Sequence, residues 1–228
     1  NTIGGAIRLV TRAPAADFAG RAALTAGSHG RREGRLVLNL PLADGFHTRL
    51  ALAGYDRDGY GRNLSSGGEV SARDAAVARW SALWSPADEV EVRLSWDRYR
   101  DRSGPPGGRR LAVTPVDPDM TPLDPGRYDV RSGATERLDL DSQGASLGVD
   151  WGLHPRWRLR SISAWREGDS QAVLDMDSLP ATLFTLRRDF GERQRSQEFQ
   201  LHGEGEGTHF IAGLYLFGLR RLWRGGHA

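Results

Sequence analysis

The feature that most constrains this chain is an alternation of apolar and polar side chains that recurs along the sequence. In the clearest run, residues 90–97, apolar residues alternate with charged or hydroxyl-bearing ones. Successive side chains of a β-strand point to opposite faces, so each run predicts a strand with one apolar and one polar face. The predicted apolar faces contain Leu36, Leu38, Leu40, Leu50, Leu52, Val90, Val92, Leu94, Leu147 and Val149. In segments 157–166 and 210–217 the pattern does not assign the faces.

The expected connections between these strands alternate in length. Short turns are predicted at residues 43–45, 85–89, 152–156 and 203–208. Longer loops are predicted near residues 56–72, 101–137 and 168–191, after a short first loop at residues 29–33. An outer-membrane barrel has short turns on the periplasmic side and long loops outside, whereas a soluble meander has no reason to separate them. The pattern therefore predicts an all-β fold, an antiparallel transmembrane β-barrel meander of about nine strands, in which the ten apolar residues named above face lipid.

Large aromatic residues accompany the four short turns. Rings with an apolar body favour the boundary between lipid and water, so these residues are candidates for an interfacial girdle. The alternative interpretation is that they belong to the core of a soluble β-sandwich. The candidate girdle residues are Phe46, Trp84, Trp151, Trp157 and Phe210.

Composition excludes several other classes of protein. The 228 residues contain no cysteine, so neither a disulfide framework nor a cysteine-based metal site is possible. All 31 basic side chains are arginine, but 29 acidic residues nearly balance them and no isolated basic block suggests nucleic-acid binding. No apolar run is long enough for a transmembrane helix, although a barrel strand needs only about 9–11 residues. No catalytic constellation, metal site or cofactor site is recognised, so the sequence predicts a protein other than an enzyme.

The most specific stretch is Asn1–Pro14, which reads as a Gly-Gly turn, a short strand from Ala6 to Thr11 and a proline stop. It resembles the end of the plug domain of TonB-dependent receptors. Further segments resemble the siderophore-receptor branch of that family. They are residues 26–33, 55–60, 196–201 and 212–217.

The resemblance implies residues 1–15 as the end of a plug and residues 16–228 as the N-terminal part of the barrel. It also implies that most of the plug precedes Asn1 and that further strands follow Ala228, so the segment alone is expected to be inactive. The implied function is uptake of a scarce large ligand, a ferric siderophore first, across the outer membrane of a Gram-negative cell. The implied partners are membrane lipid and the TonB energy-transducing complex. A passive porin-like channel and a soluble β-sandwich with a binding or adhesive role are the alternatives.

The longest predicted loop holds the candidate ligand contacts, because guanidinium groups and a phenol ring suit an anionic metal chelate. Solvated loop charge is the simpler interpretation for any single residue, and a calcium site at Asp117, Asp119, Asp124 and Asp129 is a less favoured one. The candidate ligand contacts are Arg109, Arg110, Arg127 and Tyr128. The polar faces of the strands are expected to line the lumen through Arg35, Arg49, Arg79, Glu91, Arg93, Asp97 and Asp150.

Overall fold

The computed structural model describes residues 10–113, 115, 117, 119, 121–123 and 126–227, with side chains up to residue 223. Every regular element in these residues is a β-strand. The strands are β1 (Ala19–Ala26), β2 (Arg32–Ala43), β3 (Phe46–Arg57), β4 (Gly61–Arg62), β5 (Glu69–Val70), β6 (Arg73–Ala87), β7 (Val90–Asp101), β8 (Arg137–His154), β9 (Trp157–Asp175), β10 (Thr185–Gly205) and β11 (Thr208–His227). No helix in the described part of the chain is long and apolar enough to cross a membrane.

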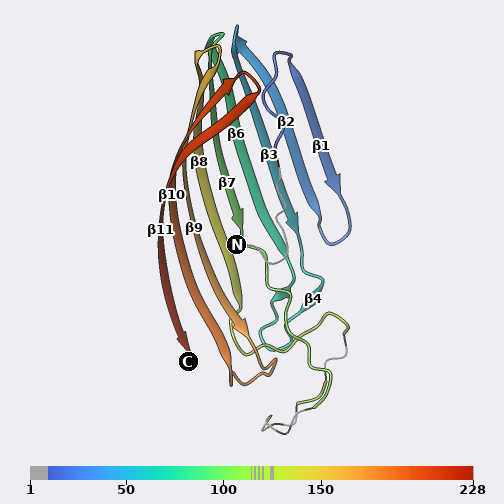
Figure 1. Cartoon of the computed structure of the whole chain (residues 1–228). Helices are drawn as coiled ribbons and strands as arrows, with labels where there is room; N and C mark the ends of the chain where they lie inside the picture. Colours follow the sequence, from blue (N-terminus) through green and yellow to red (C-terminus); the bar gives the residue numbers. More distant parts are fainter. Residues whose placement is uncertain are drawn as a thin grey trace.

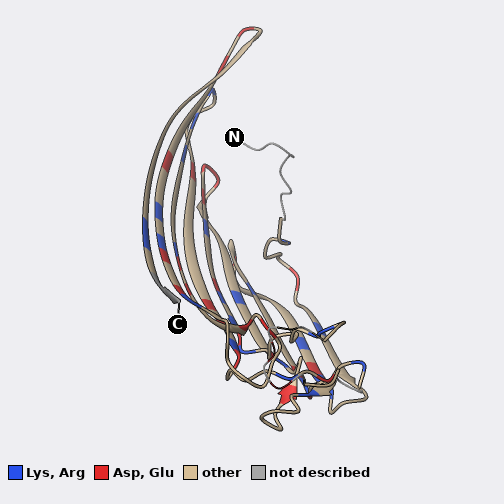
Figure 2. Cartoon of the chain, turned by 90° about the horizontal axis from the view of Figure 1, so that it is seen from below, with Lys and Arg blue, Asp and Glu red and all other residues tan. Residues whose placement is uncertain are grey.

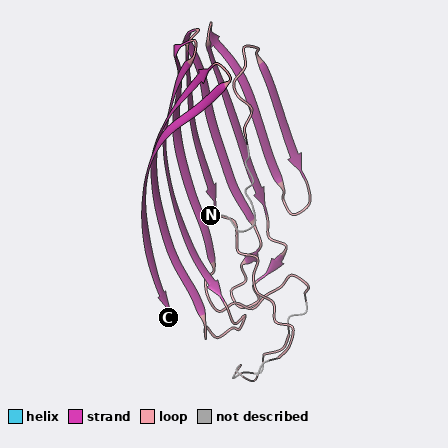
Figure 3. Ribbon diagram, in the orientation of Figure 1, coloured by secondary structure: helices cyan, strands magenta, loops and turns pink. Residues whose placement is uncertain are grey.

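Nine of the strands form one curved antiparallel sheet, in the order β1-β2-β3-β6-β7-β8-β9-β10-β11. Each strand pairs with its predecessor in the sheet, as expected for a meander (Figures 1 and 3). The small hairpin β4-β5 lies in the connection between β3 and β6 and was not predicted. The predicted all-β fold class and the count of about nine strands are confirmed.

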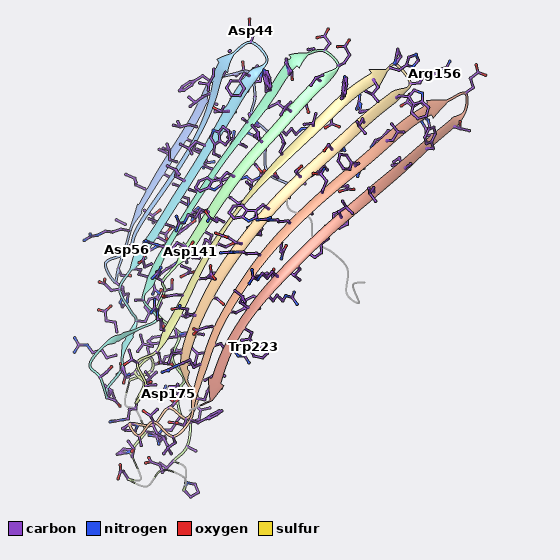
Figure 4. The ribbon with its side chains drawn as sticks, turned by 90° about the vertical axis from the view of Figure 1, so that its left-hand side faces the viewer. Asp44, Asp56, Asp141, Arg156, Asp175 and Trp223 are labelled. Atoms are coloured by element: carbon purple, nitrogen blue, oxygen red, sulfur yellow. The ribbon has the colours of Figure 1, made fainter. Side chains whose placement is uncertain are left out.

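The short and long connections lie at opposite ends of the sheet. The four short turns, marked by Asp44 and Arg156 in Figure 4, gather at one end. The loops at residues 58–72, 102–136 and 176–184 gather at the other end, with the β1–β2 turn. The loop predicted at residues 168–191 is shorter than expected, because residues 168–175 extend β9 and residues 185–191 extend β10. On the convex face these extensions carry Asp169, Gln171, Arg187 and Asp189, so hydrogen-bonded pairing persists where the apolar side of the alternation has stopped.

The register places the alternating side chains on two distinct faces. Leu38 lies beside Leu50, and Leu94 lies beside Leu147, so the predicted apolar residues follow one face across several strands. All ten of them share this face, which is convex (Figure 2). Leu94 is 39% exposed and Leu147 is 38% exposed, so no second sheet covers the convex face in the described chain. The β-sandwich alternative therefore has no support.

The opposite face is concave and is partly covered by the segment that precedes β1. Ala15 and Asp17 accept hydrogen bonds from the side-chain amide of Asn39 on β2, and the Ala15 N–H donates to the same side chain at 2.9 Å. Asn39 is only 2% exposed as a result. Most of the predicted plug strand, Ala6–Thr11, lies outside the described residues, and its described end is not part of a strand.

Candidate ligand-binding surface and concave wall

Three loops fold together at the long-loop end of the sheet. A parallel bridge joins Asn63 in the β3–β6 loop to Val130 in the β7–β8 loop. The N–H of Gly133 donates to the carbonyl of Leu179 in the β9–β10 loop at 2.8 Å. Val70, Val130 and Leu179 are 5%, 3% and 1% exposed and form a small apolar core between the loops. We call this assembly, residues 58–72, 102–136 and 176–184, the loop cluster.

Buried polar side chains fix the loop cluster. The Asn63 amide donates to the Ser132 carbonyl at 3.0 Å and its oxygen accepts the Ser132 N–H at 3.2 Å. Asp175 accepts N–H groups from Gly133, Asp177 and Ser178. Buried polar groups are costly without such partners, so these contacts specify how the loops pack.

Arg110, one of the predicted ligand contacts, is committed to the loop itself. Its side chain is 7% exposed, forms an ion pair of 3.2 Å with Asp117 and donates to the carbonyls of Thr121 and Pro122. Burial raises the pKa of Asp117, but hydrogen bonds from Thr121 and Asp119 and the charge of Arg110 outweigh it and hold that pKa below its usual value. The pair therefore ties Arg110 to Asp117, Thr121 and Pro122 of the same loop. Among the described residues, no group of three metal-binding side chains occurs, and Asp124 of the calcium interpretation lies outside them.

The other three predicted ligand contacts lie on the exposed side of the loop cluster. Tyr128 is 57% exposed, and the guanidinium of Arg127 lies 5.6 Å from its ring centroid. Arg109 donates to the Arg127 carbonyl at 3.3 Å, which ties the two parts of the loop together. The structure thus brings Arg109, Arg127 and Tyr128 close to one another.

Sequence reasoning did not select the residues that complete this surface. The ring of Tyr60 lies 6.0 Å from that of Tyr128 and 4.9 Å from that of His29 in the β1–β2 turn. The Arg57 guanidinium stacks 3.6 Å from the Tyr60 ring centroid. Three separate connections therefore contribute to one surface of rings and guanidinium groups. We call it the aromatic surface (His29, Arg57, Tyr60, Arg127, Tyr128). The hint in the sequence was that His29, Arg57 and Tyr60 lie in two segments, residues 26–33 and 55–60, that resemble the siderophore-receptor branch.

The side chains predicted to line the lumen all lie on the concave face. Asp97 accepts from Arg79 at 3.3 Å and from Arg166 at 3.0 Å. Asp150 is paired in the same way, with Arg93 and Arg160, both at 2.6 Å. Each carboxylate therefore lies between two guanidinium groups from different strands, and each ion pair helps to fix the register of β6 to β9.

One glycine makes this network possible. Arg166 on β9 reaches Asp97 on β7 by crossing β8 at Gly144, where an added Cβ would lie 3.0 Å from the guanidinium carbon. Beside this network, a cavity of about 350 Å³ lies between residues 11–14 and the concave face, bordered by Arg79, Arg93, Asp150 and Arg160. The concave wall therefore carries an excess of arginine.

The candidate girdle residues lie on the convex face near the short turns. Phe46 and Trp84 are direct neighbours in the register. The rings of Trp157 and Phe210 meet edge to face at 5.1 Å across Gly203, whose missing Cβ leaves room for the Phe210 ring. Trp151 is the fifth, and 49% of it is exposed. All five side chains are thus found together at the same end of the same face.

Several solved structures share this architecture. No protein-family model and no curated protein matches the sequence. The chain is similar to the ferric yersiniabactin uptake receptor FyuA from Yersinia pestis, with a TM-score of 0.69, 16% identity, and coverage of 96% of this chain and 33% of that one. It is also similar to the ferric-catecholate import receptor Fiu from Escherichia coli K12, with a TM-score of 0.70, 13% identity, and coverage of 92% of this chain and 33% of that one. A third similar structure is the ferric citrate transporter FecA, with a TM-score of 0.66, 16% identity, and coverage of 98% of this chain and 33% of that one.

These structures are transport receptors rather than enzymes, and this chain spans about a third of their length. The agreement extends over nearly the whole chain despite low identity, so what the two share is the architecture of the sheet. The resemblance noted in the sequence is thus confirmed in the fold: the chain has the fold of about one third of a TonB-dependent siderophore receptor, a section of its barrel.

Proposed function

We propose that this chain is the N-terminal barrel section of a TonB-dependent outer-membrane receptor that imports a ferric siderophore. Residues 1–15 would be the end of the plug, and residues 16–228 the first nine strands of the barrel. The observation that carries the proposal is the match of the sheet, over 92–98% of the chain, to structures named as siderophore or ferric-chelate importers.

The division of the sheet into two faces supports a location in the outer membrane. From β2 to β8 the convex face is apolar from the girdle residues to the level of Trp96, apart from Thr48. On β9 and β10 the same face carries Ser161, Ser163 and Gln197, whose polar groups hydrogen-bond one another. The concave face carries ion pairs. Lipid on the convex side and an aqueous, plugged interior on the concave side satisfy both faces.

The section is proposed to be inactive alone. Among the described strands, β1 and β11 each pair with one neighbour only, so each presents an unpaired edge. Each unsatisfied backbone group costs several kcal/mol in hydrocarbon. Closure of the barrel by further strands removes both edges.

The aromatic surface and Arg109 are the proposed ligand contacts. Arginine and tyrosine side chains there offer charge, hydrogen bonds and stacking to an anionic iron chelate. Arg110 and Asp117 contribute indirectly, by holding the loop that presents Tyr128.

Uptake of radioactive iron as a ferric siderophore by iron-limited cells tests the proposal, using the complete receptor. Uptake should require the TonB complex, and the double variant Arg127→Gln/Tyr128→Leu should weaken binding about tenfold, equivalent to ~1.4 kcal/mol. Arg102→Gln removes one charge from the base of the same loop and is the matched control. Uptake that persists without TonB would indicate a passive channel instead, and equal affinities of the two variants would remove the aromatic surface from the site.

A further inference from the structure

Three arginines form a compact group on the convex face of β10 and β11. Arg193 and Arg220 are direct neighbours in the register. Arg195 lies two residues from Arg193 on the same face of β10 and is diagonal to Arg220. Directly opposite residues have Cβ atoms about 4.5–5.5 Å apart, and diagonal ones are about 7–8 Å apart. The long side chains can therefore converge on one small anion. We call this group the arginine patch. In Figure 2, arginine positions (blue) lie at a similar level on these two neighbouring outer strands.

The arginine patch begins where the apolar band of the convex face ends. On β11 the convex residues Leu214 and Leu216 are followed by Gly218 and then Arg220. Trp165 on β9 is the direct register neighbour of Arg195. Towards the short turns, the same face of β9 and β10 carries Ser161, Ser163 and Gln197, whose polar groups are satisfied by hydrogen bonds to one another. Tryptophan and arginine at one level are typical of the zone where acyl chains give way to headgroups.

The patch has an excess of positive charge on its own face. Glu167 pairs with Arg193 at 3.3 Å, and Asp169 lies one convex-face step closer to the loops. On β11 the next residue, Arg221, faces the concave side and pairs there with Glu192 at 3.0 Å. Like charges placed directly opposite each other destabilise a sheet unless a counter-charge is present. Arg193 is 64% exposed in its side chain, so such a counter-charge has access from outside.

We propose that the arginine patch binds the phosphate of a membrane lipid headgroup in the outer leaflet. The inference rests on the proposed membrane location but concerns a site separate from the ligand surface and from the concave wall. Guanidinium groups form paired hydrogen bonds with phosphate oxygens, and the adjoining apolar band accommodates the acyl chains of the same lipid. The occupant is thus a lipid that carries a phosphate: its headgroup contacts the arginine patch and its acyl chains contact the apolar band.

The test uses the complete receptor in detergent micelles, with diphosphorylated lipid A as the probe and bound lipid counted by native mass spectrometry. The triple variant Arg193→Gln/Arg195→Gln/Arg220→Gln should bind at least about tenfold more weakly than the parent. The control Arg32→Gln/Arg98→Gln/Arg100→Gln removes the same charge from the same convex face on β2 and β7 and should bind within about twofold of the parent. Glu167→Gln raises the net charge of the patch and should tighten binding.

Several outcomes would overturn the proposal. These are equal binding by the triple variant and the parent, no tightening by Glu167→Gln, or equal binding of lipid A with its phosphates removed. Displacement of the lipid by millimolar inorganic phosphate alone would show that the site takes the free anion instead. Failure of the proposed membrane location would appear differently: the parent and all the variants, the control included, would then retain no lipid at all. Heat-modifiable mobility on unheated gels shows whether each variant has folded, and Glu167→Gln supplies the test if the triple variant has not.

Discussion

Two single substitutions at adjacent positions of β7, one on each face of the sheet, test which face meets lipid. Leu94 lies on the convex face between Ala82 of β6 and Leu147 of β8. Val92 and Trp96 precede and follow it on the same face, so Leu94 is within the apolar band rather than at its edge. An arginine at the midplane of a barrel's lipid face costs about 2–4 kcal/mol. Leu94→Arg should therefore reduce the folding equilibrium constant in a bilayer about 30- to 700-fold.

The neighbouring change Arg93→Leu is the matched control. Arg93 is on the concave face, paired with Asp150 at 2.6 Å, and its side chain is 53% exposed. Asp150 keeps a second partner, Arg160, also at 2.6 Å, when Arg93 is removed. Asp150 itself is buried, but because Arg160 still pairs with it and Arg93 is half exposed, the expected loss is about 1 kcal/mol, the upper end of the range for exposed ion pairs.

The measurement is urea-dependent folding of the complete receptor into vesicles, together with the folded fraction recovered from outer membranes on unheated gels. Leu94→Arg should lower both strongly, and Arg93→Leu should leave both close to the parent. Losses of equal size for the two variants would show that the convex face is not the lipid face, and the membrane location would lose its main support.

Three further predictions concern the loop cluster and the concave wall. Leu179→Ala should lower the free energy of opening of the loop cluster by about 2–5 kcal/mol, which would appear as faster amide hydrogen exchange at Gly133. Unchanged exchange at Gly133 would mean that the loops do not share a core. Burial, with the nearby charge of Asp175, raises the pKa of Glu136. The contribution of Glu136 to the stability of the loop cluster is therefore fully present below the ordinary carboxyl pKa, and it is lost as pH rises through the raised value. Loop protection should fall over that range, and Glu136→Gln should flatten the pH profile if the assignment is right. Gly144→Ala should displace the Arg166 guanidinium, so the coupling energy between Arg166 and Asp97 in a double-mutant cycle should drop from about 0.2–1 kcal/mol to near zero. A coupling energy that survives would show that Arg166 does not reach Asp97 over Gly144.

The loops show most clearly where prediction from sequence stopped. Arg109, Arg110, Arg127 and Tyr128 were selected by residue type within one loop, and residue type does not distinguish a buried structural side chain from an exposed contact. The structure separates them, because only Arg110 meets a carboxylate, Asp117, inside the loop. The partners of Tyr128 come from other connections and are distant in sequence, so no local pattern relates them.

The sequence by itself determined the strands, the two faces and the ends at which the turns and loops lie. Those properties depend on a local rule, the alternation of side chains along an extended backbone, and on the residues of short turns. Only the tertiary structure decided the length of β9 and β10, the faces of β11 and the assembly of the aromatic surface. Hydrogen-bonded pairing continues where no apolar pattern marks it, and contacts between loops depend on the register of strands that are far apart in the chain.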